Sequence, residues 1–170
     1  MRLQRLERQE PWADEPYPYI VLDQELEDVL REFGSNVGVP VKVSSRVKGK
    51  VRGRWPSLTP GQFLDRLATA YGLQWYYDGQ TLHVTTTGEA ISEMLPLGPV
   101  RFYELYRELK NLKVADPRFP IRAASQANIA LISGPPRFVS AVRETLGALQ
   151  QAYRFETTIV RGRTQERPTL

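Results

Sequence analysis

The sequence contains no cysteine and only one histidine among its 170 residues. Without cysteine the chain can form neither a disulfide nor a thiolate zinc site. It has no apolar run of about 18 residues, so we expect no membrane-spanning helix. Its first roughly 30 residues also lack the apolar core of a signal peptide, so no export signal is visible.

Catalytic chemistry has little support in the sequence. A general base needs a nucleophile or a substrate proton within reach, and nothing near His83 provides one. We therefore expect His83 to be structural or solvated. The acidic residues at positions 23–28 could suggest a metal site, but Asp23 is explained as a helix cap, and acids in a first helical turn favour the helix dipole. We predict no enzyme activity, no metal, no cofactor and no small-molecule substrate.

The charges are unevenly distributed along a chain of net charge +4 and pI near 9.5. A basic segment carries six positive charges without an acid between them, at Lys42, Arg46, Lys48, Lys50, Arg52 and Arg54. An acidic segment precedes it, with Asp23, Glu25, Glu27 and Asp28. The two segments are either separate solvated faces or complementary sides of neighbouring subunits. In the second case the basic segment would meet the acidic helix of a neighbour or another acidic partner.

The first half of the chain predicts small helices and strands after a proline-interrupted lead-in at residues 1–16. We expect a strand over 17–22, a helix capped by Asp23 and stopped at Gly38, and strands over 39–43 and 50–55. A second helix follows, with Thr59 and Gln62 at capping-box spacing and Pro60 at its first position.

A hairpin is predicted next, because Asp78-Gly79 is typical of a two-residue type I′ turn. Such a turn would pair Trp75 with Leu82 and, on the other face, Gln74 with His83.

In the second half the pattern starts again after residues 86–92, which we interpret as a linker. We expect strands over 93–97, 119–123 and 128–133, a helix near 102–112, and a last helix opened by Gly134-Pro135-Pro136. Arg137 lies at the start of that helix, where a cation opposes the dipole, so we expect it to have an outside partner and to lie at an interface. Alternation over Tyr153–Val160 predicts a final strand, and the rest of 151–170 is expected to be disordered.

These patterns predict an α+β protein made of two small subdomains. The first, over residues 17–85, follows the plan βαββαββ, and the second, over 93–150, follows a KH-like βαββα plan. A KH module grips nucleic acid with a GXXG loop between helices, and no GXXG occurs here. We therefore expect no nucleic-acid partner, although RNA binding is kept as a minor alternative.

Two stretches carry a resemblance to a known family. Residues 12–84, with Val39–Ser44, Val47–Gly53 and Leu73–Gly79, resemble the short N-terminal domain shared by secretins and TonB-dependent receptors. Asp116–Pro120 together with Ile132–Val139 resembles the second periplasmic subdomain of the secretins of type III secretion systems.

The resemblance implies a ring-building scaffold on the periplasmic side of the bacterial outer membrane. Its partners would be copies of itself and the inner-membrane ring proteins of the secretion system. In some plant-associated bacteria the secretin is encoded in two pieces, and the chain is similar to the N-terminal piece. A second, barrel-forming chain would then be a partner, joined through the strand expected near the C-terminal end. The alternative is a signalling domain of a TonB-dependent receptor that binds an anti-sigma regulator.

Overall fold

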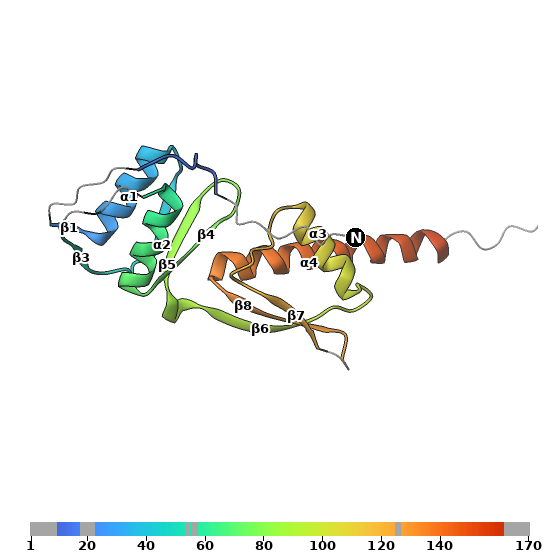
Figure 1. Ribbon diagram of the computed structural model, residues 1–170. Helices are drawn as coiled ribbons and strands as arrows, with labels where there is room; N and C mark the ends of the chain where they lie inside the picture. Colours follow the sequence, from blue (N-terminus) through green and yellow to red (C-terminus); the bar gives the residue numbers. More distant parts are fainter. Residues whose placement is uncertain (1–9, 18–22, 54, 56–57, 125–126, 162–170) are drawn as a thin grey trace, which may run out of the picture.

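The computed structural model describes residues 10–17, 23–53, 55, 58–124 and 127–161, and it forms two lobes (Figure 1). The first lobe contains β1 (Gln24–Glu25), α1 (Leu26–Val37), β2 (Val41–Val43), β3 (Lys50–Val51), α2 (Pro60–Tyr71), β4 (Leu73–Tyr77) and β5 (Leu82–Thr86). The second contains β6 (Ile91–Pro96), α3 (Phe102–Asn111), β7 (Ile121–Ala124), β8 (Ile129–Gly134) and α4 (Pro136–Arg161). The short 3-10 helix η1 (Thr87–Glu89) connects them. The predicted α+β class is confirmed.

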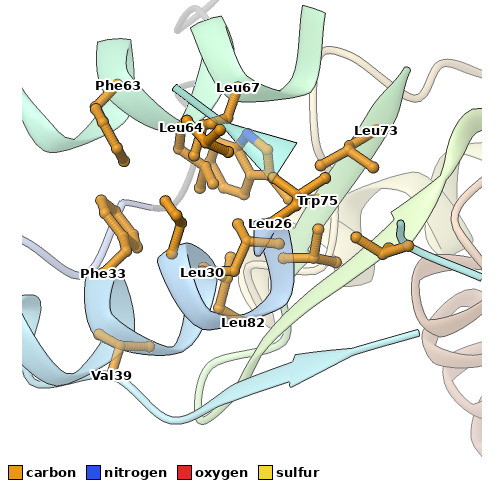
Figure 2. Packing of buried hydrophobic residues seen from close by; sticks show 14 of the residues in the cluster. Leu26, Leu30, Phe33, Val39, Phe63, Leu64, Leu67, Leu73, Trp75 and Leu82 are labelled. Atoms are coloured by element: carbon orange, nitrogen blue, oxygen red, sulfur yellow. The ribbon is translucent and has the colours of Figure 1, made fainter. Parts of the chain in front are cut away.

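The first lobe packs α1 and α2 between two small sheets. β1 pairs with β3, and the other sheet has the order β2-β5-β4, with β2 parallel to β5. The apolar stripes of both helices meet in one core, where the rings of Phe33 and Phe63 stack at 5.8 Å and Trp75 closes the sheet side (Figure 2). This core fixes the sheet against the helices.

The ends of both helices agree with the sequence signals. Thr59 Oγ1 accepts a hydrogen bond from Gln62 N, and Gln62 Oε1 accepts one from Thr59 N, so the predicted capping box is present. α1 ends at Gly38, whose left-handed φ of 72° is the conformation that glycine adopts without strain.

The expected cap and first strand need correction. α1 begins after Glu25, which makes no side-chain cap, while Asp23 lies two residues earlier and pairs with Arg52 across the β1–β3 ladder. Of the strand predicted over 17–22, only Tyr17 is among the described residues, and it bridges to Leu58. The strand predicted over 50–55 is limited to β3 at Lys50–Val51.

The hairpin register also differs from the prediction. Trp75 pairs with Val84 and Tyr76 with His83, so residues 78–81 form a longer loop in place of a two-residue turn. Asp78 Oδ1 closes this loop by accepting hydrogen bonds from the N–H groups of Gln80 and Thr81. The register moves by two residues, so every side chain keeps the face that alternation assigned to it.

Trp12 shows that the expected lead-in is part of the first core. Its side chain is only 9% exposed and meets the Phe33 ring edge to face at 5.3 Å. Residues 1–9 of the lead-in lie outside the described residues. A single tryptophan between prolines and acids has no periodicity, so the pattern could not place it in a core.

In the second lobe, α3 and α4 cover one face of the antiparallel sheet β6-β8-β7 (Figure 1). β6 begins at Ile91, inside the stretch that was interpreted as a linker. α4 begins at Pro136 and continues to Arg161, so the strand predicted over 153–160 is wrong. The helical stripe simply continues through Leu149 and Tyr153 onto the second core, and extending a helix costs no new nucleation.

Candidate interface within the chain and toward partners

Tyr76 links the two lobes. It lies on β4 of the first lobe, next to Trp75, and successive strand side chains point to opposite faces. Tyr76 is therefore buried in the second core, with its ring edge to face with Phe138 at 5.5 Å. Its hydroxyl donates to the carbonyl of Val114 at 3.1 Å. Burial raises the pKa of Tyr76, so the hydroxyl stays neutral and acts as a donor.

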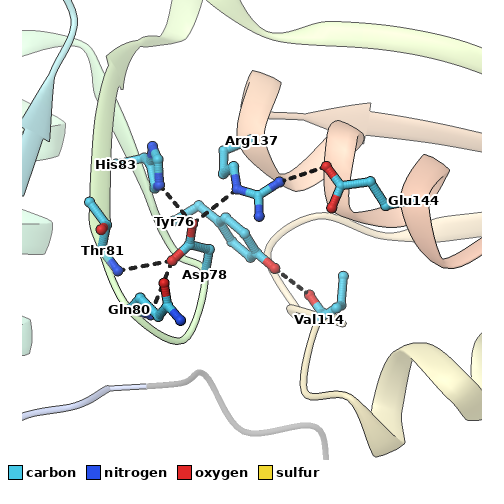
Figure 3. Close-up of polar contacts among 8 residues, drawn as sticks. All are labelled: Tyr76, Asp78, Gln80, Thr81, His83, Val114, Arg137 and Glu144. Carbon is cyan, nitrogen blue, oxygen red and sulfur yellow. Dashed lines mark hydrogen bonds and ion pairs between the residues drawn. The ribbon is translucent and has the colours of Figure 1, made fainter.

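Asp78 is the polar centre of the same boundary (Figure 3). Its Oδ2 accepts a hydrogen bond from Arg137 Nε at 2.9 Å and lies 2.9 Å from His83 Nε2, while Oδ1 holds the hairpin loop. Burial alone would raise the pKa of Asp78. The hydrogen bonds from Thr81, Arg137, Gln80 and His83 outweigh burial and hold this pKa well below its ordinary value of 3.8.

Arg137 has its expected partner, but within the chain. It lies in the first turn of α4 and reaches Asp78 in the other lobe, while its Nη1 donates to Glu144 at 3.0 Å. The hydrogen bond to Asp78 raises the pKa of Arg137. A carboxylate beside a helix N-terminus is favourable, so Asp78 also offsets the cost of placing a cation there.

A cation on an aromatic ring forms a third link between the lobes. Asp116 holds the Arg118 guanidinium through two hydrogen bonds, of 3.0 and 2.7 Å. The guanidinium carbon then lies 3.8 Å from the centre of the Trp75 ring. Such a contact contributes about 0.5–2 kcal/mol. The two lobes are thus connected by Tyr76, Asp78, Arg118 and Arg137.

His83 belongs to this boundary and not to an exposed polar face. It pairs with Tyr76 across the hairpin in place of Gln74, and its side chain is only 17% exposed. Its hydrogen-bond partner is the Asp78 carboxylate, so its role here is structural. Among the described residues no group of acids and histidines is arranged to hold a metal ion.

The predicted charged surfaces are partly paired inside the chain. Lys50 Nζ lies 3.7 Å from Glu25, and Arg52 Nε lies 2.9 Å from Asp23, across the β1–β3 ladder. Glu27 pairs with Arg31 along α1, and Asp28 is exposed on the same helix. Such exposed pairs contribute little to stability, typically about 0–1 kcal/mol.

The other basic side chains are distributed differently. Lys42, Arg46 and Lys48 are exposed, and Arg54 lies outside the described residues. The basic segment therefore contains two residues that pair within the chain, Lys50 and Arg52, and three exposed residues for which no ion pair occurs among the described residues. In the described part of the chain, no helix is long and apolar enough to cross a membrane.

The depressed pKa of Asp78 predicts a specific pH dependence. The carboxylate contributes stability that is complete above its ordinary pKa of 3.8 and is lost as pH falls below that value. We expect Asp78→Asn to lower the midpoint of thermal unfolding at pH 7, by about 2–4 °C for each kcal/mol lost. The difference in unfolding midpoint between the parent protein and Asp78→Asn should become smaller as pH falls below 3.8. A difference that is constant with pH would show that the charge of Asp78 contributes nothing.

Comparisons with known proteins agree with this architecture. Residues 19–85 match the family described as the N0 domain of the SPI-1 type 3 secretion system secretin. The nodulation protein NolW of Rhizobium fredii is 45% identical over 139 residues, which cover 82% of this chain and 59% of NolW. The type 3 secretion system secretin of Ralstonia nicotianae is 37% identical over 134 residues, which cover 79% of this chain and 23% of that protein.

Two solved structures share the fold. A chain in the structure of the Salmonella SPI-1 injectisome basal body proteins InvG, PrgH and PrgK superimposes with a TM-score of 0.72 at 24% identity, covering 79% of this chain and 28% of that one. A chain in a Salmonella structure of InvG N0N1 with SpaPQR and PrgHK gives 0.71 at 23% identity, covering 85% of this chain and 99% of that one. The sequence thus spans about 59% of NolW and a smaller share of the full secretins. Residues 19–85 thus match the N0 domain of type 3 secretion system secretins, and the chain is similar to NolW and to such a secretin over about four fifths of its length.

Proposed function

We propose that the chain is a ring subunit of a type III secretion secretin on the periplasmic side of the outer membrane. Copies of the chain would contact one another around the ring, and the first lobe would dock on inner-membrane ring proteins. The matched Salmonella structures contain PrgH and PrgK beside InvG, which supports such partners. Where the secretin is split, a barrel-forming second chain completes the assembly.

The observation that carries this proposal is an uncovered apolar sheet face in the second lobe. Across β6, β8 and β7, the outward positions align Met94 with Leu131 and Arg122, and Pro96 with Ile129, while Ser92 and Ser133 hydrogen-bond to each other at one end of this face. Met94 is 71% exposed and Leu131 is 37% exposed. A solvated face of an antiparallel sheet is normally polar, so an apolar one indicates a contact surface.

A second copy of the chain is the occupant that best fits this face. Ring contacts are heterologous, so they need two different patches on each subunit. The second patch is on α3, on the other side of the lobe, where Tyr103 is 67% exposed and Leu112, just after the helix, is 56% exposed. Arg107 and Lys110 lie over the rings of Tyr103 and Tyr106 on that side, so the second patch combines aromatic and basic side chains.

A charge placed in the apolar face should prevent assembly without unfolding the lobe. We expect Met94→Asp to reduce recovery of the chain in envelope-bound rings by at least about tenfold, because an unpaired carboxylate buried at a contact costs several kcal/mol. Ala127→Asp adds the same charge at an exposed position in the loop between β7 and β8 of the same lobe and should have no such effect. Recovery is measured by co-fractionation with the secretion complex. Equal recovery of both variants would contradict the proposal.

A further inference from the structure

The outer edge of β2 has no strand beside it among the described residues. The sheet order is β2-β5-β4, so β2 stands at its end and pairs only with β5. An edge strand presents a row of main-chain groups that another chain can pair with, unless the protein blocks it.

The hydrogen bonds show which main-chain groups of β2 face outward. Leu82 N donates to Pro40 O, and Ser44 N donates to Val84 O, both at 2.9 Å. In a parallel pair these bonds alternate along the strand, so positions 40, 42 and 44 face β5. The N–H and C=O groups of Val41 and Val43 therefore point away from the sheet.

A proline whose missing N–H faces outward is one feature that blocks an edge strand, and β2 has none. Pro40 faces β5, so its missing N–H leaves the outer side unchanged. The side chains of Val41 and Val43 pack against the first core and hold the strand in place. A groove runs beside the start of the strand, lined by Arg31, Gly34 and Ser35 of α1 and by residues 38–41. Gly34 keeps α1 close, because a Cβ there would lie 2.3 Å from Val41 Cγ2.

The charge around the edge is positive. Lys42 lies on β2 itself, and Arg46 and Lys48 follow it, all three exposed. Lys50 and Arg52 already pair with Glu25 and Asp23, and Arg31 pairs with Glu27. Glu89 is an acid near this end of β2, where it accepts a hydrogen bond from Ser44. Burial would raise the pKa of Glu89, but hydrogen bonds from Ser44 and Thr86, with a smaller contribution from the charge of Arg46, lower it. No ion pair to Lys42 or Lys48 occurs within the described residues.

We infer that β2 is a docking edge for an extended acidic segment of a partner protein, which adds as a strand beside Val41–Val43. Main-chain hydrogen bonds to Val41 and Val43 would provide the affinity, and Lys42 with the basic residues after it would select acidic side chains. The inference rests on the proposed docking of the first lobe and specifies how it occurs, but it does not depend on the contact between copies through the second lobe.

The test uses the full chain and a synthetic peptide of about eight residues, a common strand length, with alternating threonine and glutamate. A peptide with lysine in place of glutamate is the control. We expect the acidic peptide to shift the amide NMR signals of Val41 and Val43 and to bind more weakly as salt screens the charges. Lys42→Glu should weaken binding by about twofold to fivefold, as for an exposed ion pair.

A pair of variants separates the edge from packing. Val43→Pro removes the outward N–H, and Val43→Ala shortens the side chain but keeps that N–H. We expect the proline variant to lose peptide binding and the alanine variant to retain it, with unfolding midpoints checked for both. The inference would be overturned if both variants bound the peptide equally or if only the lysine peptide bound. It would also be overturned if the amide NMR signals shifted only in other strands or did not shift at all. None of these outcomes bears on ring assembly, which Met94→Asp tests.

Discussion

Replacing Tyr76 by alanine is expected to lower the free energy of unfolding by about 3–5 kcal/mol, as for other large buried aromatic residues. Tyr76 lies on the sheet of one lobe and is 3% exposed within the core of the other, so its loss weakens the contact between them. We therefore also expect the parent protein to unfold in a single transition and the Tyr76→Ala variant to unfold in two. Circular dichroism and tryptophan fluorescence, followed together in urea, should then give different midpoints.

Tyr76→Phe is the matched control for this experiment. It keeps the ring against Phe138 and removes only the hydroxyl that donates to Val114. Its cost should be about 1 kcal/mol, although the Val114 carbonyl then loses this partner. A Tyr76→Ala protein that unfolds in one transition with unchanged stability would show that the lobes do not depend on this contact.

The ion pair between Asp78 and Arg137 should show strong coupling. Each single change, Asp78→Ala or Arg137→Met, leaves the other charge partly buried, and we expect a loss of about 2–3 kcal/mol for each. The double variant should lose less than the sum, with a coupling free energy of about 1–2 kcal/mol in a double-mutant cycle. Denaturant unfolding of the four proteins gives this value.

Glu144→Gln is the control for the ion pair. Glu144 is the second partner of Arg137, but its side chain is 65% exposed, so its loss should cost no more than about 0.5 kcal/mol. If Glu144→Gln cost as much as Asp78→Ala, the contribution of Arg137 would come from within α4. Additive losses for Asp78 and Arg137 would likewise contradict a link between the lobes.

Local signals in the sequence predicted the parts of the fold that depend on neighbouring residues. The capping box at Thr59 and Gln62 and the glycine stop at Gly38 follow from short-range hydrogen bonding and backbone conformation, and both are present. The predicted two-residue turn was wrong because Asp78-Gly79 fits both a two-residue turn and the longer loop over residues 78–81 that the structure shows. The Asp78 side chain, which binds the loop N–H groups, decided between them.

Contacts between distant residues could not be predicted in the same way. Arg137 gave a usable signal, because a cation at a helix start needs compensation, but the sequence could not show that Asp78, 59 residues away, supplies it. Arg118 and Trp75 gave no such signal. The prediction of a strand near the C-terminal end was wrong because Leu149 and Tyr153 also fit the apolar stripe of the helix. Both side chains pack against the second core, which stabilises the longer helix.

The proposed ring contact is tested most directly by site-specific cross-linking in the assembled secretion complex. A photoreactive amino acid at position 94 samples the apolar sheet face, and one at the exposed position 127 of the same lobe is the control. We predict that position 94 yields cross-links between two copies of this chain in envelope complexes that also contain the inner-membrane ring proteins, and that position 127 does not. A chain that enters these complexes without any copy-to-copy cross-link from position 94 would contradict the proposed contact.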